Sequence, residues 1–109
     1  MGGGAMIVLT AVYTIRPEDR EAIWQDIWTM TQFVQKNEPG CLMYRAHQSL
    51  DADNRILLYE AYRDQESFDR HSQTPYFQDI VLRRVVPRLI QRERALWEVD
   101  PHDERPAPS

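Results

Sequence analysis

The chain has 109 residues, of which 42% are hydrophobic and 10% aromatic, and its net charge is −4. This length and composition indicate one globular domain and exclude a disordered chain. The acidic balance argues against nucleic acid as a partner, because such proteins must neutralise phosphates. No apolar run is long enough to cross a membrane and no signal-peptide pattern is present, so we expect no membrane association and a cytoplasmic location.

The sequence offers little for a metal centre or for the common cofactor motifs. Cys41 is the single cysteine, so an intrachain disulfide is excluded and a reducing compartment fits. One cysteine and three scattered histidines cannot build a structural zinc site, and we expect no bound metal. Glycine-rich nucleotide-binding, P-loop, zinc-protease and nucleophile-elbow motifs are also absent from the sequence.

The two ends of the chain differ in composition from its middle. Residues 1–5 are glycine-rich, and residues 100–109 contain three prolines and no large apolar side chain. Such segments bury too little apolar surface to become ordered. We therefore expect a flexible N-terminus at 1–5, one domain over 6–99 and a disordered tail at 100–109.

The first part of the domain reads as a strand followed by a helix. Residues 6–15 are rich in β-branched and aromatic side chains, which predicts a strand. Pro17 and the acidic residues after it suit the start of a helix, and Pro39-Gly40 ends it, so the helix spans 17–37. Its apolar stripe consists of Ile23, Ile27, Met30 and Val34, with Trp24 and Trp28 one position along.

The second part reads as a hairpin, a helical region and a last strand. Residues 41–49 and 55–63 predict two strands joined by a turn. A helix begins with Asp64 as its N-cap, and a second helix follows Thr74-Pro75. This second helix carries Phe77, Ile80, Val81 and Val85 at helical spacing, ends near Pro87, and is followed by a strand over 91–99.

This order of elements defines a fold class. The pattern β-α-β-β-α-β predicts an α+β protein with the ferredoxin-like plan, an antiparallel sheet and helices on one of its faces. The other face of the sheet is left bare in so small a domain. We therefore expect a homodimer that pairs sheet against sheet.

Four segments of the sequence, taken in order, carry a family resemblance. They are EPGCLMY at 38–44, LYEAYRD at 58–64, FDRH at 68–71 and TPYF at 74–77. Together they resemble the antibiotic biosynthesis monooxygenase domain family, and the resemblance extends over residues 6–99. The chain departs from the family pattern at Tyr62, where the family often has Trp, and at Tyr76, where it usually has His.

The resemblance implies a dimeric α+β barrel with a ligand pocket between the sheet and the helices of each protomer. Many members are oxygenases of quinols, hydroxylated aromatics or polyketide aromatics that need neither metal nor flavin. A haem-degrading branch uses an Asn on the first strand and a His on the last helix. Thr10 or Ala11 and Val81 stand at those positions here, so haem is disfavoured and we expect no cofactor.

His71 and Tyr62 are the candidate catalytic residues. An imidazole titrates near neutral pH, so His71 can accept a phenolic proton and return it. The alternative is a helix-end histidine bonded to nearby backbone. Tyr62 and Glu60 share one strand face, because side chains alternate along a strand, and either could contact a substrate hydroxyl. The alternatives are a packing role for Tyr62 and an ion pair for Glu60 with Arg45 or Arg94.

Aromatic side chains supply the candidate substrate-binding surface. Trp24 and Trp28 are one helical turn apart and offer two flat apolar faces to an aromatic ligand. The alternative is that they belong to the core. The other candidates for the pocket wall are Phe68, Phe77 and Tyr44, with core or dimer interface as the alternative. Arginines between 83 and 94 read as a solvated face, from which one or two could reach an acidic substrate group.

The sequence therefore supports one main hypothesis and two alternatives. The main hypothesis is a cofactor-independent monooxygenase whose partners are a small aromatic substrate, such as a quinol or polyketide-like phenol, and dioxygen. The first alternative is a dimer that binds a small metabolite without turnover. The second is an isomerase of the same fold.

Overall fold

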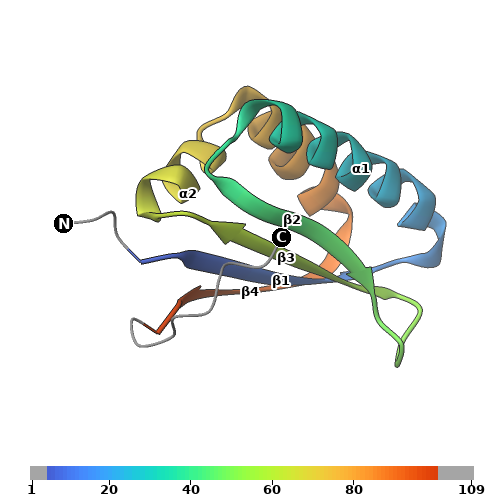
Figure 1. Cartoon of the computed structure of the whole chain (residues 1–109). Helices are drawn as coiled ribbons and strands as arrows, with labels where there is room; N and C mark the ends of the chain where they lie inside the picture. Colours follow the sequence, from blue (N-terminus) through green and yellow to red (C-terminus); the bar gives the residue numbers. More distant parts are fainter. Residues whose placement is uncertain (1–4, 101–109) are drawn as a thin grey trace.

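The computed structural model of the protein describes residues 5–100, and Figure 1 shows the path of the chain. The expectations for residues 1–4 and for the tail at 101–109 fall outside the described residues. Four strands form one antiparallel sheet in the order β2-β3-β1-β4. Their bounds are β1 Ile7–Ile15, β2 Cys41–Gln48, β3 Arg55–Tyr62 and β4 Leu89–Glu98.

The helices of the described residues cover one face of this sheet (Figure 1). None of them is both long and apolar enough to span a bilayer. The fold is thus the predicted α+β arrangement in the order β-α-β-β-α-β. The helical elements are η1 Pro17–Asp19, α1 Arg20–Asn37, α2 Gln65–Ser72, η2 Phe77–Val85 and η3 Val86–Arg88.

Two helices differ in detail from the expectation. The first turn of the helix predicted at 17–37 is the 3₁₀ helix η1, and α1 begins at Arg20. Pro17 has no N–H to donate and suits the first position of a helix. The N–H of Asp19 donates to the carbonyl of Arg16, three residues back, which is the hydrogen bond of a 3₁₀ turn. The second helix, η2, is a π-helix, and the N–H of Val86 bonds five residues back to the carbonyl of Val81.

The buried core lies between α1, η2 and the helix-facing side of the sheet. Strand alternation turns Ala11, Tyr13, Ile56 and Leu58 to this side. The apolar stripe of α1 packs onto them as predicted, and Ile23, Ile27, Met30 and Val34 are all buried. Asp26 of α1, itself buried, pairs with Arg84 of η2 at 2.9 Å and ties the two helices together.

The link between α1 and β2 brings the chain very close to α2. Pro39 disfavours helical geometry at Glu38, and α1 accordingly ends at Asn37. Gly40 then passes against Ser67 in the first turn of α2. A Cβ on Gly40 would lie 2.2 Å from Oγ and 2.7 Å from Cβ of Ser67. The glycine is required by this approach and not by its backbone angles, since its φ is not positive.

We expect Gly40→Ala to lower the free energy of unfolding by about 1–3 kcal/mol, because the added methyl group overpacks a closed contact. Urea unfolding measures this cost. The matched experiment repeats the change in a Ser67→Gly background, where both clashing atoms are gone, and the cost of Gly40→Ala should then largely disappear. An equal cost in both backgrounds would show that Ser67 is not its cause.

Candidate functional site

Strand β3 places a carboxyl and a phenol side by side in the interior. Glu60 and Tyr62 are both buried, and the Tyr62 hydroxyl donates to Glu60 Oε1 at 2.6 Å. Burial raises the pKa of Glu60, although His71 and the Tyr62 hydroxyl oppose this shift. Burial and the nearby Glu60 also raise the pKa of Tyr62, so its hydroxyl stays protonated and acts as a donor.

His71, in the last turn of α2, lies between two carboxyl groups. The N-cap Asp64 fixes the start of α2 by accepting from the N–H of Ser67 at 2.8 Å. The buried His71 ring then has Nδ1 at 3.0 Å from both oxygens of Glu38. Its Nε2 lies 3.9 Å from Glu60 Oε1. His71 therefore connects a carboxylate at the end of α1 to the carboxyl of β3.

Aromatic rings surround this imidazole. The ring centres of Phe77, Tyr62 and Tyr44 lie 5.2, 5.4 and 5.7 Å from that of His71. Phe68 packs edge-on against Tyr62 at 5.4 Å. These rings exclude water and weaken screening, which strengthens the interaction of His71 with its two carboxyl partners.

Glu38 was not among the predicted site residues, and the structure makes it the partner of His71. The Tyr76 hydroxyl also donates to Glu38 Oε2, and the Tyr76 ring stacks on Phe33. One signal was available in the sequence. A carboxylate at a helix C-terminus opposes the helix dipole, and such a residue needs a donor elsewhere. Its placement just before Pro39 marks it as a residue turned out of the helix.

A small hollow lies between the sheet and η2, where the resemblance places a ligand pocket. Its volume is about 10 Å³, room for one water-sized group. The residues that matter for its chemistry are Tyr13, Tyr44, Glu60, Phe77, Arg92 and Arg94. Burial raises the pKa of Tyr13 to about 12, so this phenol is neutral at physiological pH. His71 does not line the hollow itself, but its Nε2 faces Glu60, which does.

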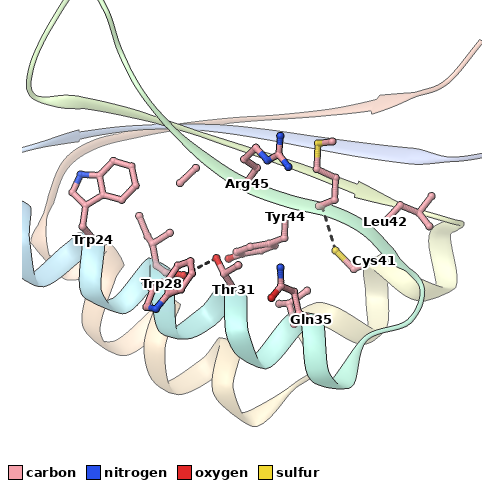
Figure 2. A pocket seen from close by; sticks show the side chains of 12 residues that line it. Trp24, Trp28, Thr31, Gln35, Cys41, Leu42, Tyr44 and Arg45 are labelled. Carbon is pink, nitrogen blue, oxygen red and sulfur yellow. Dashed lines mark hydrogen bonds between the residues drawn. The ribbon is translucent and has the colours of Figure 1, made fainter. Parts of the chain in front are cut away.

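A larger groove of about 470 Å³ opens along the edge of the sheet between α1 and β2. Figure 2 shows Trp24, Trp28, Thr31 and Gln35 on α1, with Tyr44 extending from β2 into the space between them. Trp28 is 61% exposed. The groove lining includes none of His71, Glu60 or Tyr62. Tyr44 borders both the groove and the hollow, so it separates the two spaces.

The predicted residues thus divide between two places. His71, Tyr62 and Glu60 come together, with Phe68, Phe77 and Tyr44 around them. Trp24 and Trp28 line the separate groove. Neither arginine alternative for Glu60 forms an ion pair with it within 4 Å, and Arg45 lies on the opposite face of the sheet because it pairs with Tyr59. The hydrogen-bond partner of Glu60 is instead Tyr62.

Chemically, the arrangement can hold and move a proton. With the Nδ1 hydrogen donated to Glu38, Nε2 is the basic nitrogen and faces Glu60. The Glu38 carboxylate also stabilises the imidazolium that forms when Nε2 accepts a proton. This is the geometry of a general base supported by a carboxylate.

The positions relevant to metals and haem carry other side chains. Within residues 5–100, no three His, Cys, Asp or Glu side chains are arranged to hold a metal ion. Ala11 and Val81 line the hollow with apolar groups. Thr10 lies on the opposite face of the sheet and accepts from Trp97 Nε1 at 2.9 Å.

The fold is a ferredoxin-like α+β fold, with a four-stranded sheet and helices on one of its faces. Glu60 and Tyr62 form a hydrogen-bonded pair buried between the two layers. A family model described as antibiotic biosynthesis monooxygenase matches residues 6–83. The chain therefore belongs to the antibiotic biosynthesis monooxygenase family.

Two curated relatives and two solved structures illustrate this membership. "Uncharacterized protein sll1783" of Synechocystis sp. (strain ATCC 27184 / PCC 6803 / Kazusa) is 30% identical over 82 residues, which are 73% of this chain and 54% of that protein. The chain thus spans about half the length of that relative. "Putative monooxygenase YcnE" of Bacillus subtilis (strain 168) is 28% identical over 76 residues, which are 70% of this chain and 79% of that protein.

The solved structures share the fold. A "putative antibiotic biosynthesis monooxygenase" from Caulobacter crescentus CB15 has a TM-score of 0.83 at 20% identity, covering 89% of this chain and 92% of its own. A conserved protein from Methanosarcina mazei Go1 has a TM-score of 0.80 at 20% identity, covering 86% of this chain and 92% of its own.

Glu60→Gln should change how stability depends on pH. The folded protein raises the pKa of Glu60 above its usual 4.5, so the folded state holds this proton to a higher pH than the unfolded state. Wild-type stability is therefore lost as pH rises from about 4.5 through the folded pKa. The glutamine does not titrate, and its oxygen still accepts from Tyr62.

Urea unfolding of both proteins between about pH 4 and pH 8 tests this expectation. The stability of Glu60→Gln relative to wild type should increase with pH. Glu66→Gln, which changes an exposed carboxylate of α2, is the control and should not reproduce the trend. A difference between Glu60→Gln and wild type that stays constant with pH would contradict the assignment.

Proposed function

We propose that this protein is a cofactor-independent monooxygenase of a quinol or a hydroxylated, polyketide-like aromatic molecule. The observation that carries the proposal is the buried His71, whose Nδ1 meets a carboxylate and whose Nε2 faces Glu60 at the wall of the hollow. Membership of the monooxygenase family supports the reaction class. The hollow has room for the oxygen of a substrate beside Glu60, while the aromatic ring of that substrate stays outside it.

The chemistry requires one ionisation, which these residues can perform. The substrate hydroxyl gives its proton to Glu60, and His71 shares it through Nε2. The resulting anion is electron-rich at the ring carbon and transfers electrons to dioxygen, and a carbon–oxygen bond forms there. Loss of the ring hydrogen and cleavage of the O–O bond leave one oxygen atom in a quinone and the other in water.

Water exclusion assists both stages of this reaction. Phe68, Phe77 and Tyr44 shield the carboxyl and imidazole groups, so each electrostatic contact is stronger than it would be in water. The Tyr62 hydroxyl is a neutral donor beside Glu60, and it can stabilise negative charge on the carboxylate or on a substrate oxygen.

His71→Ala should lower the rate of oxygen uptake on the order of 10²-fold, because it removes the base that shares the proton. The measurement is oxygen consumption with a panel of quinols and polyketide-like phenols before and after chelation. His47→Ala is the matched control, since His47 is exposed and lies on the other face of the sheet. Silence across the panel, or activity lost on chelation, would count against the proposal, and an unchanged rate would remove His71 from the mechanism.

A second function has its own structural support. The 470 Å³ groove, with its tryptophans, has room for a small aromatic molecule, and its lining contains no member of the His71 cluster. This favours binding of a metabolite without turnover. Such a protein would bind an aromatic ligand saturably, lose that binding in Trp28→Ala, and consume no oxygen.

We also propose that two copies pair through their bare sheet faces, as the resemblance implies. Strand alternation turns an apolar set away from the helices, and Trp97 in that set is 57% exposed. No helix of the described residues covers this face (Figure 1). Burying it against a second copy is favourable in proportion to its apolar area. The set is Val12, Met43, Leu57, Tyr59, Ala95 and Trp97.

Tyr59→Arg should convert the dimer to a monomer, because it places a charge in the centre of that face. Light scattering coupled to size-exclusion chromatography measures the mass. Leu50→Arg is the control, since Leu50 is fully exposed in the β2–β3 turn and should leave the dimer intact. A monomeric wild-type protein would contradict the proposal.

A further inference from the structure

Strand β4 brings two guanidinium groups to the interior side of the sheet. Arg92 and Arg94 pair across the ladder with Tyr13 and Ala11, both of which face the helices. Both arginines line the hollow beside Glu60. Arg92 is half-buried and Arg94 is exposed, so only the buried part of Arg92 requires a partner from within the protein or from a ligand.

The described residues compensate these charges only in part, because Arg94 interacts with Glu60 through its charge without forming a close ion pair. Within residues 5–100, no carboxylate lies within 4 Å of either guanidinium, and the ion pairs of the neighbouring β4 residue Glu93 go to Arg55 instead. Arg92 bonds to the Tyr13 phenol, yet its Nε is buried and has no hydrogen-bond partner. An N–H buried without an acceptor indicates a place for an acceptor that comes from outside the chain.

The size and opening of the hollow limit what that acceptor is. About 10 Å³ holds one oxygen-sized group and no ring. The apolar body of a ligand must therefore stay outside the hollow, and the exposed Arg94 puts the solvent-facing part of its lining at β4. Leu96 lies on the same face two residues beyond Arg94, and it is 56% exposed, so it offers apolar surface there.

We propose that Arg92 and Arg94 form an anion subsite that binds the negatively charged oxygen of an aromatic ligand, with its ring against Leu96. Guanidinium groups suit this task because their N–H groups form charge-assisted hydrogen bonds in a fixed fork. The Tyr13 phenol, whose pKa burial raises to about 12, is a neutral donor to the same oxygen. Glu60 also faces the hollow, and once it has accepted the substrate proton it no longer repels the anion.

This inference narrows the substrate class of the proposed monooxygenase to aromatic anions, and in that respect it rests on the proposed function. The shared chemistry is an anionic oxygen, which a ring carboxylate or an ionised ring hydroxyl can supply. Both forms can be tested by binding alone, without oxygen uptake.

The test measures binding of 2-naphthoate and of the isosteric neutral 2-naphthamide by isothermal titration calorimetry under argon. Wild type should bind the carboxylate at least tenfold more tightly than the amide, and added salt should weaken only the carboxylate. Arg94→Gln and Arg92→Gln should each weaken 2-naphthoate on the order of tenfold and leave 2-naphthamide within twofold. Arg83→Gln, which removes an exposed charge paired with Asp79, should change neither affinity.

A second probe separates the two sources of the anion. If the subsite takes an ionised hydroxyl, 2-naphthol bound at neutral pH should show the absorption spectrum of its anion, and Arg94→Gln should abolish that spectrum. If 2-naphthol stays neutral when bound while 2-naphthoate binds as expected, the subsite is one for carboxylates.

Equal affinity for 2-naphthoate and 2-naphthamide, no binding of 2-naphthoate at millimolar concentration, or an equal effect of Arg83→Gln would overturn the inference. Arg94 is exposed, so Arg94→Gln should fold normally. The test therefore stays decisive even if Arg92→Gln fails to fold. Binding as expected without oxygen uptake from any substrate would leave the subsite in place and refute the monooxygenase, which distinguishes the two failures.

Discussion

The contact of His71 with Glu38 is the constraint on which the interior of this protein depends. Two carboxyl groups and an imidazole are buried within a few ångströms of one another. Removing such groups from water is costly unless each finds a partner, so the elements that carry them must bring these groups within reach of one another. The end of α1, the last turn of α2 and the middle of β3 are thereby fixed relative to each other.

The surrounding fold makes that meeting possible. Pro39 ends α1 and turns Glu38 inward, Gly40 lets β2 begin directly against α2, and the Asp64 cap sets the rotation of α2 that directs His71 toward the sheet. Each of these three features is local in sequence, and each helps to position the region around His71 and Glu38. The Asp26–Arg84 pair holds α1 and η2 together.

Two spaces with different properties result from this packing. The edge groove is roomy and aromatic, and its lining lacks the buried proton-transfer groups. The interior hollow is small, and its lining includes Glu60, Arg92 and Arg94. Tyr44 forms the wall between them, and burial raises the pKa of its phenol well above the usual 10.0. Tyr44 therefore separates a groove that has room for an aromatic ring from a hollow that does not.

The sequence alone determined the strand and helix order, the family, and the placement of Glu60 and Tyr62 on one strand face, because periodicity and short motifs are local properties. It did not predict the hydrogen bond between these two side chains. It also proposed His71 as a candidate catalytic residue, and that role stays a prediction. It did not reveal Glu38 as the partner of His71, the separation of Trp24 and Trp28 from that histidine, or the inward direction of Arg92 and Arg94. Those features arise where α1, α2, β3 and β4 meet, between residues as far apart as 38 and 71 in the chain. Only tertiary packing decides them, since the free energy of burying a charge depends on which distant group lies against it.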